Sequence, residues 1–293
     1  MLPNFLVIGA EKAGTTWLYD TLKQHPDIFL PDTKELSYFN RLDSNLKPSD
    51  YFVTLPLKWY EDFFSDRAHE HATGDISPMY ICDTEAPARI AKTLPNAKLI
   101  AILRDPIERA ASQYWMAKNK RHISASLEEV VASRHPAIIQ RGLYADQIKR
   151  YMDFFSRSQL LVLIFEEVMS DRNSAIEKIC GFIGVDPERL SRDRLDIAVN
   201  AAAAYKWPWI YNASVTAATA LRKMRFLSWV PRLLKKTGLN EYVKVINARE
   251  FEKPLLNENL KADLCAYYAE DRIRLEAFLG RRIECWTRHS ENQ

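Results

Sequence analysis

The sequence FLVIGAEKAGTTW, residues 5–17, decides the fold of this chain. A mostly apolar run of strand length leads into a short loop with one lysine, Lys12, and then into a helical pattern opened by Thr15 and Thr16. The first backbone N–H groups of a helix have no partner inside the helix, and the helix dipole adds positive potential there. A strand, a loop of small residues and a helix start in this order predict a phosphate-binding loop.

The spacing of Gly9 and Gly14 nearly matches the P-loop of ATP- and GTP-hydrolysing proteins. In those proteins a lysine follows the second glycine, and the next Ser/Thr hydroxyl holds Mg²⁺. Here Thr15 follows Gly14, and Lys12 precedes that glycine by two positions. Because small residues between a strand and a helix are also common in α/β folds, the interpretation needs a second motif. The loop itself predicts a phosphate-like ligand without a metal-bound triphosphate.

Composition excludes several classes of protein. The chain has 293 residues, of which 47% are hydrophobic and 27% charged, as in a soluble globular protein. A net charge of +3 and the lack of a recognisable binding motif argue against a nucleic-acid partner. No apolar run reaches the ~18 residues of a membrane span, and the first strand leaves no room for a signal peptide. The four cysteines form no CxxC pair, which predicts reduced thiols and a cytoplasmic protein.

Apolar runs of strand length alternate with helical patterns through the first 200 residues. The expected strands are 5–8, 72–76, 98–103 and 160–165, and the expected helices are 15–24, 84–94, 107–118, 127–133, 145–155 and 173–183. This alternation predicts an α/β fold with a P-loop-like parallel sheet flanked by helices. The carboxyl third has no strand pattern, so we expect a helical C-terminal extension, with a helix at 258–279 that Gly280 ends.

A single domain, 1–293, accounts for this pattern. We expect an α/β core at 1–200, a basic insertion rich in aromatic residues at 201–256 and a C-terminal helix at 257–293. Residues 203–253 contain ten Lys/Arg and three Glu, a net charge of +7 within a chain of net +3.

The second motif follows the expected strand 98–103. Arg104 comes directly after that strand, Asp105 and Pro106 suit a helix start, and Ser112 lies two turns along the helix. Ligands of open parallel sheets bind at the carboxyl ends of the strands, and arginine grips phosphate through paired donors. Arg104 and Ser112 therefore form a second candidate anion site.

The two motifs together resemble the sulfotransferases that use 3′-phosphoadenosine 5′-phosphosulfate (PAPS), in particular the heparan-sulfate-type enzymes and their bacterial relatives. The resemblance rests on VIGAEKAGTTWLYDTLKQHPDIFLPDTKELSYF and LIAILRDPIERAASQY, with weaker segments such as GDISPMY, RGLYADQIKRY and CGFIGV in the same order. It implies that the first loop binds the 5′-phosphosulfate through Lys12, Ala13, Gly14, Thr15, Thr16 and Trp17. It also implies that Arg104 and Ser112 bind the 3′-phosphate.

The resemblance also implies catalytic roles. Lys12 is expected to stabilise the bridging oxygen as the bond from sulfur breaks, and no metal is needed. Glu35 matches the KE-x-x-x-F segment in which the heparan-sulfate-type enzymes carry their catalytic glutamate, although an exposed Lys-Glu pair is the alternative. Small-molecule sulfotransferases use a histidine as the base. Here His25 is expected to be structural, whereas His69 and His71 precede a strand and remain weaker candidates.

One segment departs from the family pattern. Where heparan-sulfate-type enzymes show a lysine in a Glu-Lys-Thr/Ser-Pro segment, this chain has Ile76 within Asp75-Ile76-Ser77-Pro78. A grip on the sulfuryl group from this position is therefore missing, and a highly anionic polysaccharide acceptor is less favoured. Asp75 is left with two interpretations, a carboxylate that binds the acceptor or acts as an acid or base, and a cap at the strand end.

The basic segment adds candidates for both substrates. Trp207 could stack on a sugar ring or pack in the core, and Arg249 or Lys253 could reach the 3′-phosphate. Residues 206–236 mix aromatic, leucine and basic side chains, so peripheral membrane contact competes with packing of amphipathic helices on the domain.

We therefore expect a PAPS-dependent sulfotransferase acting on a hydroxyl of a carbohydrate or glycolipid. The alternatives are a sulfotransferase for a small-molecule or lipid hydroxyl, a P-loop kinase, and a non-catalytic nucleotide- or saccharide-binding protein. The oligomeric state and the position sulfated are not predicted.

Overall fold

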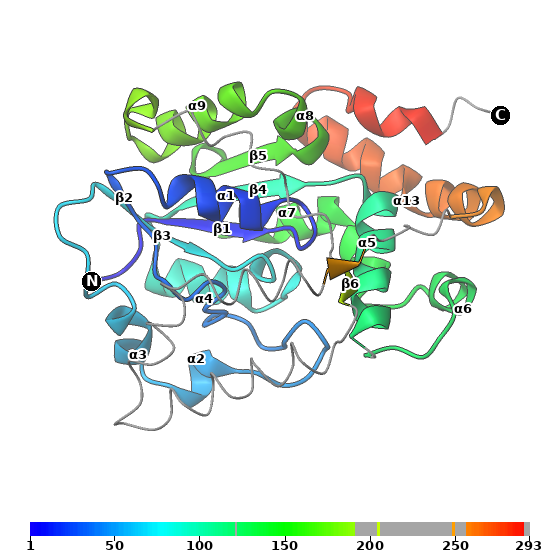
Figure 1. Ribbon diagram of the computed structural model, residues 1–293, viewed down its shortest axis with the longest axis horizontal. Coiled ribbons are helices and arrows are strands. Elements are labelled where there is room, and N and C mark those ends of the chain that lie inside the picture. Colours follow the sequence, from blue (N-terminus) through cyan, green and yellow to red (C-terminus); the bar gives the residue numbers. More distant parts are fainter. Residues whose placement is uncertain (121, 191–203, 206–247, 250–255, 290–293) are drawn as a thin grey trace. The chain divides into compact units, whose positions relative to one another are not determined.

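The computed structural model describes residues 1–120, 122–190, 204–205, 248–249 and 256–289 (Figure 1). The chain divides into two compact units, of which the larger is drawn from 1–114, 125–199 and 256–293. The smaller unit is drawn from 115–124 and 200–255. All described residues that position the candidate site belong to the larger unit.

A five-stranded parallel sheet forms the centre of the larger unit, in the order β2-β3-β1-β4-β5. Its strands are β1 (Phe5–Gly9), β2 (Ile28–Phe29), β3 (Ala72–Ile76), β4 (Lys98–Leu103) and β5 (Leu160–Ile164). The register pairs Phe5 with Gly74 and with Lys98, and Leu99 with Leu160. Because the strands are parallel, their carboxyl ends share one edge of the sheet, and Lys12 and Arg104 follow the ends of β1 and β4.

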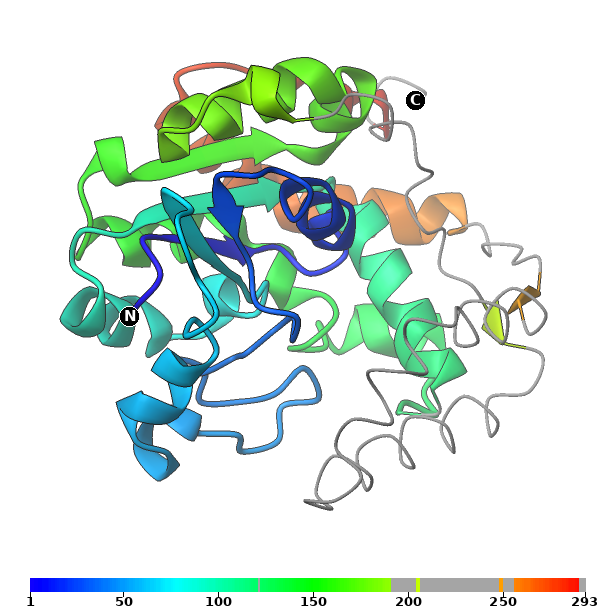
Figure 2. The same cartoon turned by 60° about the vertical axis from the view of Figure 1, so that its left-hand side comes forward.

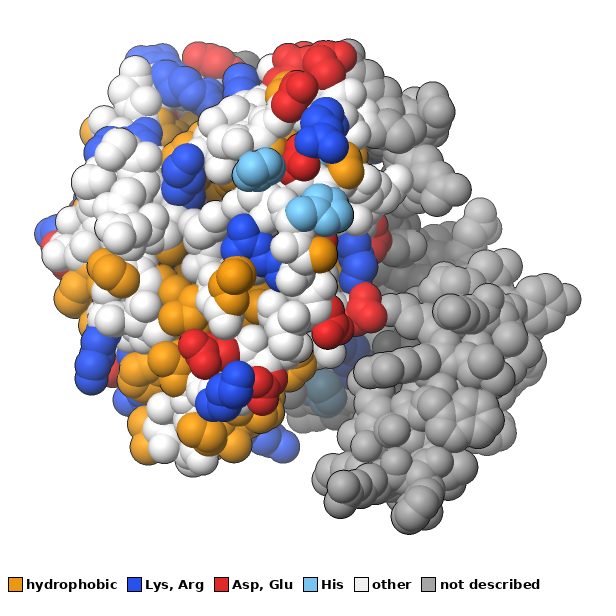
Figure 3. All heavy atoms as spheres, turned by 90° about the vertical axis from the view of Figure 1, so that its left-hand side faces the viewer, with side chains coloured by type: hydrophobic (Ala, Val, Ile, Leu, Met, Phe, Trp, Pro, Cys, Tyr) orange, Lys and Arg blue, Asp and Glu red, His pale blue; other side chains and the backbone are white. Residues whose placement is uncertain are grey.

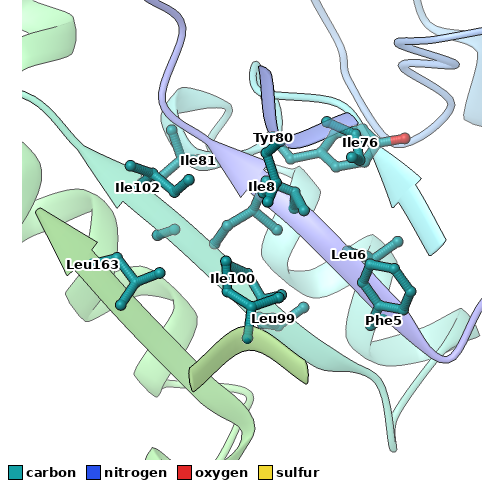
Figure 4. Packing of buried hydrophobic residues seen from close by; sticks show 14 of the residues in the cluster. Phe5, Leu6, Ile8, Ile76, Tyr80, Ile81, Leu99, Ile100, Ile102 and Leu163 are labelled. Carbon is teal, nitrogen blue, oxygen red and sulfur yellow. The ribbon is translucent and has the colours of Figure 1, made fainter. Parts of the chain in front are cut away.

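The strands are apolar on both faces because helices cover both faces. Every residue of β1 and β3 is buried, as are all of β4 after Lys98. Figure 4 shows buried side chains on three neighbouring strands: Leu6 and Ile8 on β1, Ile100 and Ile102 on β4, and Leu163 on β5. Burial on two faces explains why these strands read as continuous apolar runs rather than as alternating patterns.

Helices flank the sheet on both sides. The longer ones are α1 (Thr15–Leu22), α4 (Ala86–Thr93), α5 (Pro106–Asn119), α7 (Tyr144–Met152), α9 (Arg172–Ile183) and α13 (Glu258–Leu279). As Figures 1 and 2 show, α1 and α9 lie over one face and α4 and α7 over the other, where α13 packs on α7. This two-sided arrangement confirms the predicted fold class, including a helix at the carboxyl end.

Shorter elements connect these parts. They are α2 (Tyr51–Thr54), α3 (Leu57–Asp62), α6 (Leu127–Ala132) and α8 (Phe165–Ser170), with 3₁₀ turns at Tyr80–Cys82, Gln140–Gly142, Arg157–Gln159, Pro187–Arg189 and Glu284–His289. A capping box begins α6, where the side chains of Ser126 and Glu129 each bond to the other's backbone N–H.

The smaller unit contains a short antiparallel pair, β6 (Ala204–Tyr205) with β7 (Ala248–Arg249). The expectation of a carboxyl third without strands is wrong at these four residues. Strands of two residues carry no readable period, which is why the sequence pattern misses them.

The face turned toward the viewer in Figure 3 carries acidic and basic side chains side by side. Hydrophobic side chains gather in its lower part, where α2 and α3 lie, and these helices include the exposed Tyr51, Val53 and Leu57. Among the described helices, none combines the length and the apolar character that crossing a bilayer requires.

Candidate active site

The donor loop, residues 10–14, leaves β1 at the carboxyl edge of the sheet and turns sharply into α1. Its turn places Lys12 at φ 69° and Gly14 at φ 81°, both in the left-handed region. A side chain at Gly14 would meet Phe165, because an added Cβ would lie 2.8 Å from its Cε2 atom. The backbone N–H of Ala10 donates to Ile102 O at 2.8 Å, which ties the loop to β4. The loop is thus held against β4 and packs closely on Phe165.

The amino end of α1 has backbone N–H groups that can donate hydrogen bonds to a ligand. Gly14 is the N-cap and has no side chain to bond the first-turn N–H groups of Thr15, Thr16 and Trp17. Trp17 Nε1 is a buried atom without a hydrogen-bond partner. Buried polar groups in native proteins are nearly always paired, so these donors mark a place where an anion fits.

Arg104 connects the second motif to the donor loop. Its Nη1 donates to Lys12 O at 3.2 Å, and its Nη2 donates to Glu108 Oε2 at 3.2 Å. The guanidinium lies over the ring of Phe165, 5.1 Å from its centroid, and the side chain is 14% exposed. Ser112 follows Glu108 by four residues and lies on the same side of α5, partly exposed. The predicted second anion site therefore adjoins the first.

Asp105 holds this motif in place rather than facing a ligand. Its Oδ1 accepts from the backbone N–H groups of Ile107 and Glu108, at 2.8 and 3.1 Å, which caps α5. Its own N–H donates to Glu166 Oε1 at 3.0 Å. The hydroxyl of Tyr144 donates to Arg104 O at 2.9 Å and fixes the other side of the turn.

Glu35 lies in a loop beside the amino end of α1. Its backbone has φ 64°, its carboxylate is 45% exposed, and its Oε1 accepts from Lys34 Nζ at 3.2 Å. The same Lys34 Nζ donates to Thr16 Oγ1 at 3.0 Å. Lys34 thereby links Glu35 to the first turn of α1.

Asp75 is buried beneath this loop. Its Oδ2 accepts from the hydroxyls of Tyr60 and Tyr80, at 3.0 and 2.8 Å, and its Oδ1 accepts from Ser77 Oγ at 2.8 Å. Burial raises the pKa of Asp75 to about 6, against the three hydroxyl donors that lower it, and the charge of Glu35 raises it further. With both oxygens engaged in the core, the geometry favours a supporting role over contact with an acceptor.

Two hydrogen bonds join Asp75 to the loop that holds Glu35. Ser77 Oγ, which donates to Asp75, accepts from the backbone N–H of Ser37 at 3.1 Å. Ser37 has φ 53°, two residues after Glu35 with φ 64°. Left-handed backbone at non-glycine residues persists only where surrounding contacts hold it.

A cleft opens next to the donor loop. An ion pair at 2.8 Å joins Arg141 to Glu11, which precedes Lys12, and both side chains are largely buried. The pKa of Glu11 is raised, chiefly by burial. The charge of Arg141 lowers this pKa, and the charge of Glu35 raises it. Arg141 also lines the cleft, which has a volume of about 320 Å³. Its polar lining includes three arginines, two aspartates and two glutamines: Arg41, Arg141, Arg150, Asp83, Asp146, Gln140 and Gln147.

Several predicted residues lie elsewhere. His25 is buried and bonds through both ring nitrogens, to Asp186 O at 2.8 Å and to Asp27 N at 3.0 Å, which confirms its structural role. His69 and His71 are exposed and precede β3, at the sheet edge opposite the candidate site. They are therefore not near it. Ile76 is buried in the core, 3% exposed.

The candidates of the basic segment cannot be compared with the described site. Trp207, Lys253 and residues 206–236 lie outside the described residues, and Arg249 is described only as backbone in β7. Their assignments stay predictions.

Sequence reasoning missed three parts of the site. Lys34 entered only as a partner in an exposed pair, and neither the contact of Arg141 with Glu11 nor that of Phe165 with Arg104 was expected. The position of Lys34 directly before the predicted catalytic glutamate was a usable signal for it. The other two contacts join residues far apart in the chain and leave no local pattern.

Comparison with known proteins assigns the chain to a family. Residues 2–204 match the family model of the sulfotransferase domain. The chain belongs to this family. Over 192 residues it is 30% identical to heparan sulfate glucosamine 3-O-sulfotransferase 3A1 of Mus musculus, covering 63% of this chain and 46% of that protein. Over 208 residues it is 36% identical to bifunctional heparan sulfate N-deacetylase/N-sulfotransferase 4 of the same species, covering 64% and 23%.

A solved structure supports the same assignment. The crystal structure of a sulfotransferase from Alicyclobacillus acidocaldarius matches with a TM-score of 0.67 and 26% identity, covering 98% of this chain and 100% of that chain. The chain spans less than half the length of the two curated sulfotransferases named above. The resemblance to heparan-sulfate-type sulfotransferases and bacterial relatives is confirmed.

Proposed function

We propose that this sulfotransferase-family chain moves the sulfuryl group of PAPS to a hydroxyl of a carbohydrate or glycolipid. The observation that carries the proposal is the bond from Arg104 Nη1 to Lys12 O at 3.2 Å. It couples the two anion-binding motifs within one compact unit, and a nucleotide with phosphate at both its 3′ and 5′ positions is the ligand that needs both.

The chain's own residues suit the two ends of that nucleotide. The first-turn N–H groups of α1 and the hydroxyls of Thr15 and Thr16 would hold the 5′-phosphosulfate, with Lys12 beside it. Arg104 and Ser112 would hold the 3′-phosphate. PAPS supplies an activated sulfuryl group whose leaving group is adenosine 3′,5′-bisphosphate.

Transfer requires alignment, a base and charge neutralisation. In this scheme Glu35 takes the proton of the acceptor hydroxyl as the acceptor oxygen bonds to sulfur and the bond from sulfur to the bridging phosphate oxygen breaks. Lys12 neutralises charge on that bridging oxygen. The loop holding Glu35 is supported through Ser77 by Asp75, so its carboxylate is positioned before the acceptor arrives.

The acceptor is assigned to the cleft next to the donor loop. Its volume of about 320 Å³ accommodates a sugar unit, and a lining of arginines, glutamines and two aspartates suits hydroxyl groups. Two relatives carry heparan sulfate in their printed names, which supports a carbohydrate. Ile76 in place of a lysine argues for a less anionic chain than heparan sulfate.

The alternatives have less support. A P-loop kinase needs an aspartate free for Mg²⁺ after β4, whereas Asp105 caps α5. A small-molecule or lipid hydroxyl would use the same donor site and differ only in the cleft. Among described residues no group of three His, Cys, Asp or Glu side chains could hold a metal ion. Cytoplasmic localisation and membrane contact through 206–236 stay predictions.

Turnover with labelled PAPS and a panel of neutral and acidic oligosaccharides, glycolipids and phenols tests the proposal. We expect labelled product from a carbohydrate or glycolipid, and its loss by about 10²-fold or more in both Lys12→Ala and Glu35→Gln. Transfer to phenols alone would contradict the acceptor class. Unchanged turnover in either variant would contradict the catalytic roles.

A further inference from the structure

We infer that Lys34 and Thr16 form a subsite for the transferred sulfuryl group, with Lys34 as a further catalytic residue. The inference rests on the proposed sulfuryl transfer and deepens it. No assignment above gives Lys34 a role beyond its pair with Glu35.

The position of the ammonium group is the first observation. Lys34 Nζ lies 3.0 Å from Thr16 Oγ1 and 3.2 Å from Glu35 Oε1. Thr16 belongs to the turn of α1 that would hold the 5′ end of the donor, and Glu35 is the proposed base for the acceptor. The sulfuryl group passes from the 5′ end of the donor to the acceptor oxygen whose proton Glu35 takes, so Lys34 lies beside its path.

The balance of charge gives the second observation. The charge of Glu35 raises the pKa values of both Glu11 and Asp75. The negative charges of these three carboxyl groups therefore repel one another at this edge of the sheet. A sulfuryl group adds another negative charge with three oxygens. Arg141 already pairs with Glu11, and β3 ends in the buried Ile76, so neither strand β3 nor the cleft arginine supplies a cation there.

The pair between Lys34 and Glu35 is weak enough to exchange. The Glu35 carboxylate is 45% exposed, and ion pairs of this kind contribute only ~0–1 kcal/mol. The Lys34 side chain is 18% exposed and so is held more firmly than its partner. Arrival of the sulfuryl group moves Lys34 from Glu35 to the sulfuryl oxygens. This exchange frees the carboxylate to accept the hydroxyl proton when the donor is in place.

Calorimetry can separate a sulfuryl contact from general support of α1. Adenosine 3′,5′-bisphosphate has both phosphates of PAPS and lacks only the sulfuryl group. In Lys34→Met we expect the affinity for PAPS, measured without acceptor, to fall about tenfold while that for the bisphosphate changes less than about twofold. In Glu35→Gln the competing carboxylate is removed, so PAPS affinity is retained or increased although turnover is lost.

Lys23→Met is the matched control, because Lys23 also pairs with an acidic side chain near α1, Asp32 at 2.5 Å, but lies at the other end of that helix. It should change neither affinity. Turnover should fall about 10²-fold in Lys34→Met and recover in part in Lys34→Arg.

Two results would overturn the inference. Equal losses of PAPS and bisphosphate affinity in Lys34→Met would reduce Lys34 to a support for the 5′-phosphate. No loss of either would leave it a partner of Glu35 alone. If the unaltered protein binds neither nucleotide, the proposed function itself fails, and this outcome is distinct from both.

Discussion

At the scale of single residues, the strongest assignments are those that follow the carboxyl end of a strand. Lys12 follows β1 and Arg104 follows β4. The two meet where the Arg104 side chain donates a hydrogen bond to the backbone oxygen of Lys12 at 3.2 Å. Their predicted neighbourhood could be read from the sequence because parallel strands share an edge. The support of Glu35 could not, since it depends on Ser77, which lies 40 residues from Ser37 in sequence.

Asp75 provides a test at this scale through pH. Burial raises its pKa from the usual 3.8 to about 6, so between these pH values the folded protein holds a proton there that the unfolded chain releases. This contribution to the free energy of unfolding is present below pH 4 and is lost as the pH rises to about 6, a change of about 3 kcal/mol. Asp75→Asn should remove this dependence.

Denaturant unfolding of both proteins at several values between pH 4 and 7 measures the effect. If the two free energies of unfolding keep a constant difference across that range, Asp75 does not titrate as its burial implies.

At the scale of elements, the long periodic segments were predicted and the short ones were not. The structure confirms α13 at Glu258–Leu279 and β4 at Lys98–Leu103. The expected strand 160–165 runs one residue too far, because Phe165 opens α8 within an unbroken apolar run. No period marks that boundary. The two-residue strand β2 was missed for the same reason.

The junction of donor loop and α1 gives a prediction at this scale. Gly14→Ala places a side chain at φ 81° and 2.8 Å from Phe165, so we expect a loss of about 1–3 kcal/mol in stability and weaker nucleotide binding. The matched control is Gly181→Ala in α9, where nothing lies within 4 Å of the added Cβ. It should stabilise the helix by about 0.5–1 kcal/mol.

Thermal unfolding with and without adenosine 3′,5′-bisphosphate compares the two variants. Equal stability of the Gly14→Ala and Gly181→Ala variants would mean that the loop relaxes to admit the side chain. That result would contradict a rigid phosphate-binding loop.

A contact between α13 and α7 gives a second prediction about elements. The N-cap of α7, Leu143, has no capping side chain, and Asp271 of α13 instead accepts from Ala145 N through both oxygens at 3.1 Å. Asp271 is 4% exposed. Asp271→Ala should cost about 1–3 kcal/mol because a buried N–H loses its acceptor.

Asp263→Ala on the same helix removes only the partly exposed pair with Arg134, and should cost about 1 kcal/mol or less. Chemical denaturation measures both losses. A smaller loss for Asp271→Ala than for Asp263→Ala would contradict the capping role.

At the scale of the whole molecule, the sequence predicts a parallel sheet but leaves the order of its strands open. The order β2-β3-β1-β4-β5 places the two motif-bearing strands, β1 and β4, next to each other. That adjacency turns two separate sequence motifs into one candidate nucleotide site. The cleft beside it depends on Arg141, which is 130 residues from its partner Glu11, and no local pattern could indicate it.

The most direct test of this adjacency is calorimetric titration with adenosine 3′,5′-bisphosphate and with adenosine 5′-phosphate, both without Mg²⁺, on the unaltered protein and on Arg104→Gln. We predict that the bisphosphate binds the unaltered protein without metal and that Arg104→Gln weakens it by about tenfold or more. Affinity for the monophosphate should not change. Equal affinity of both proteins for the bisphosphate, or binding only as a magnesium complex, would contradict the two-anion site.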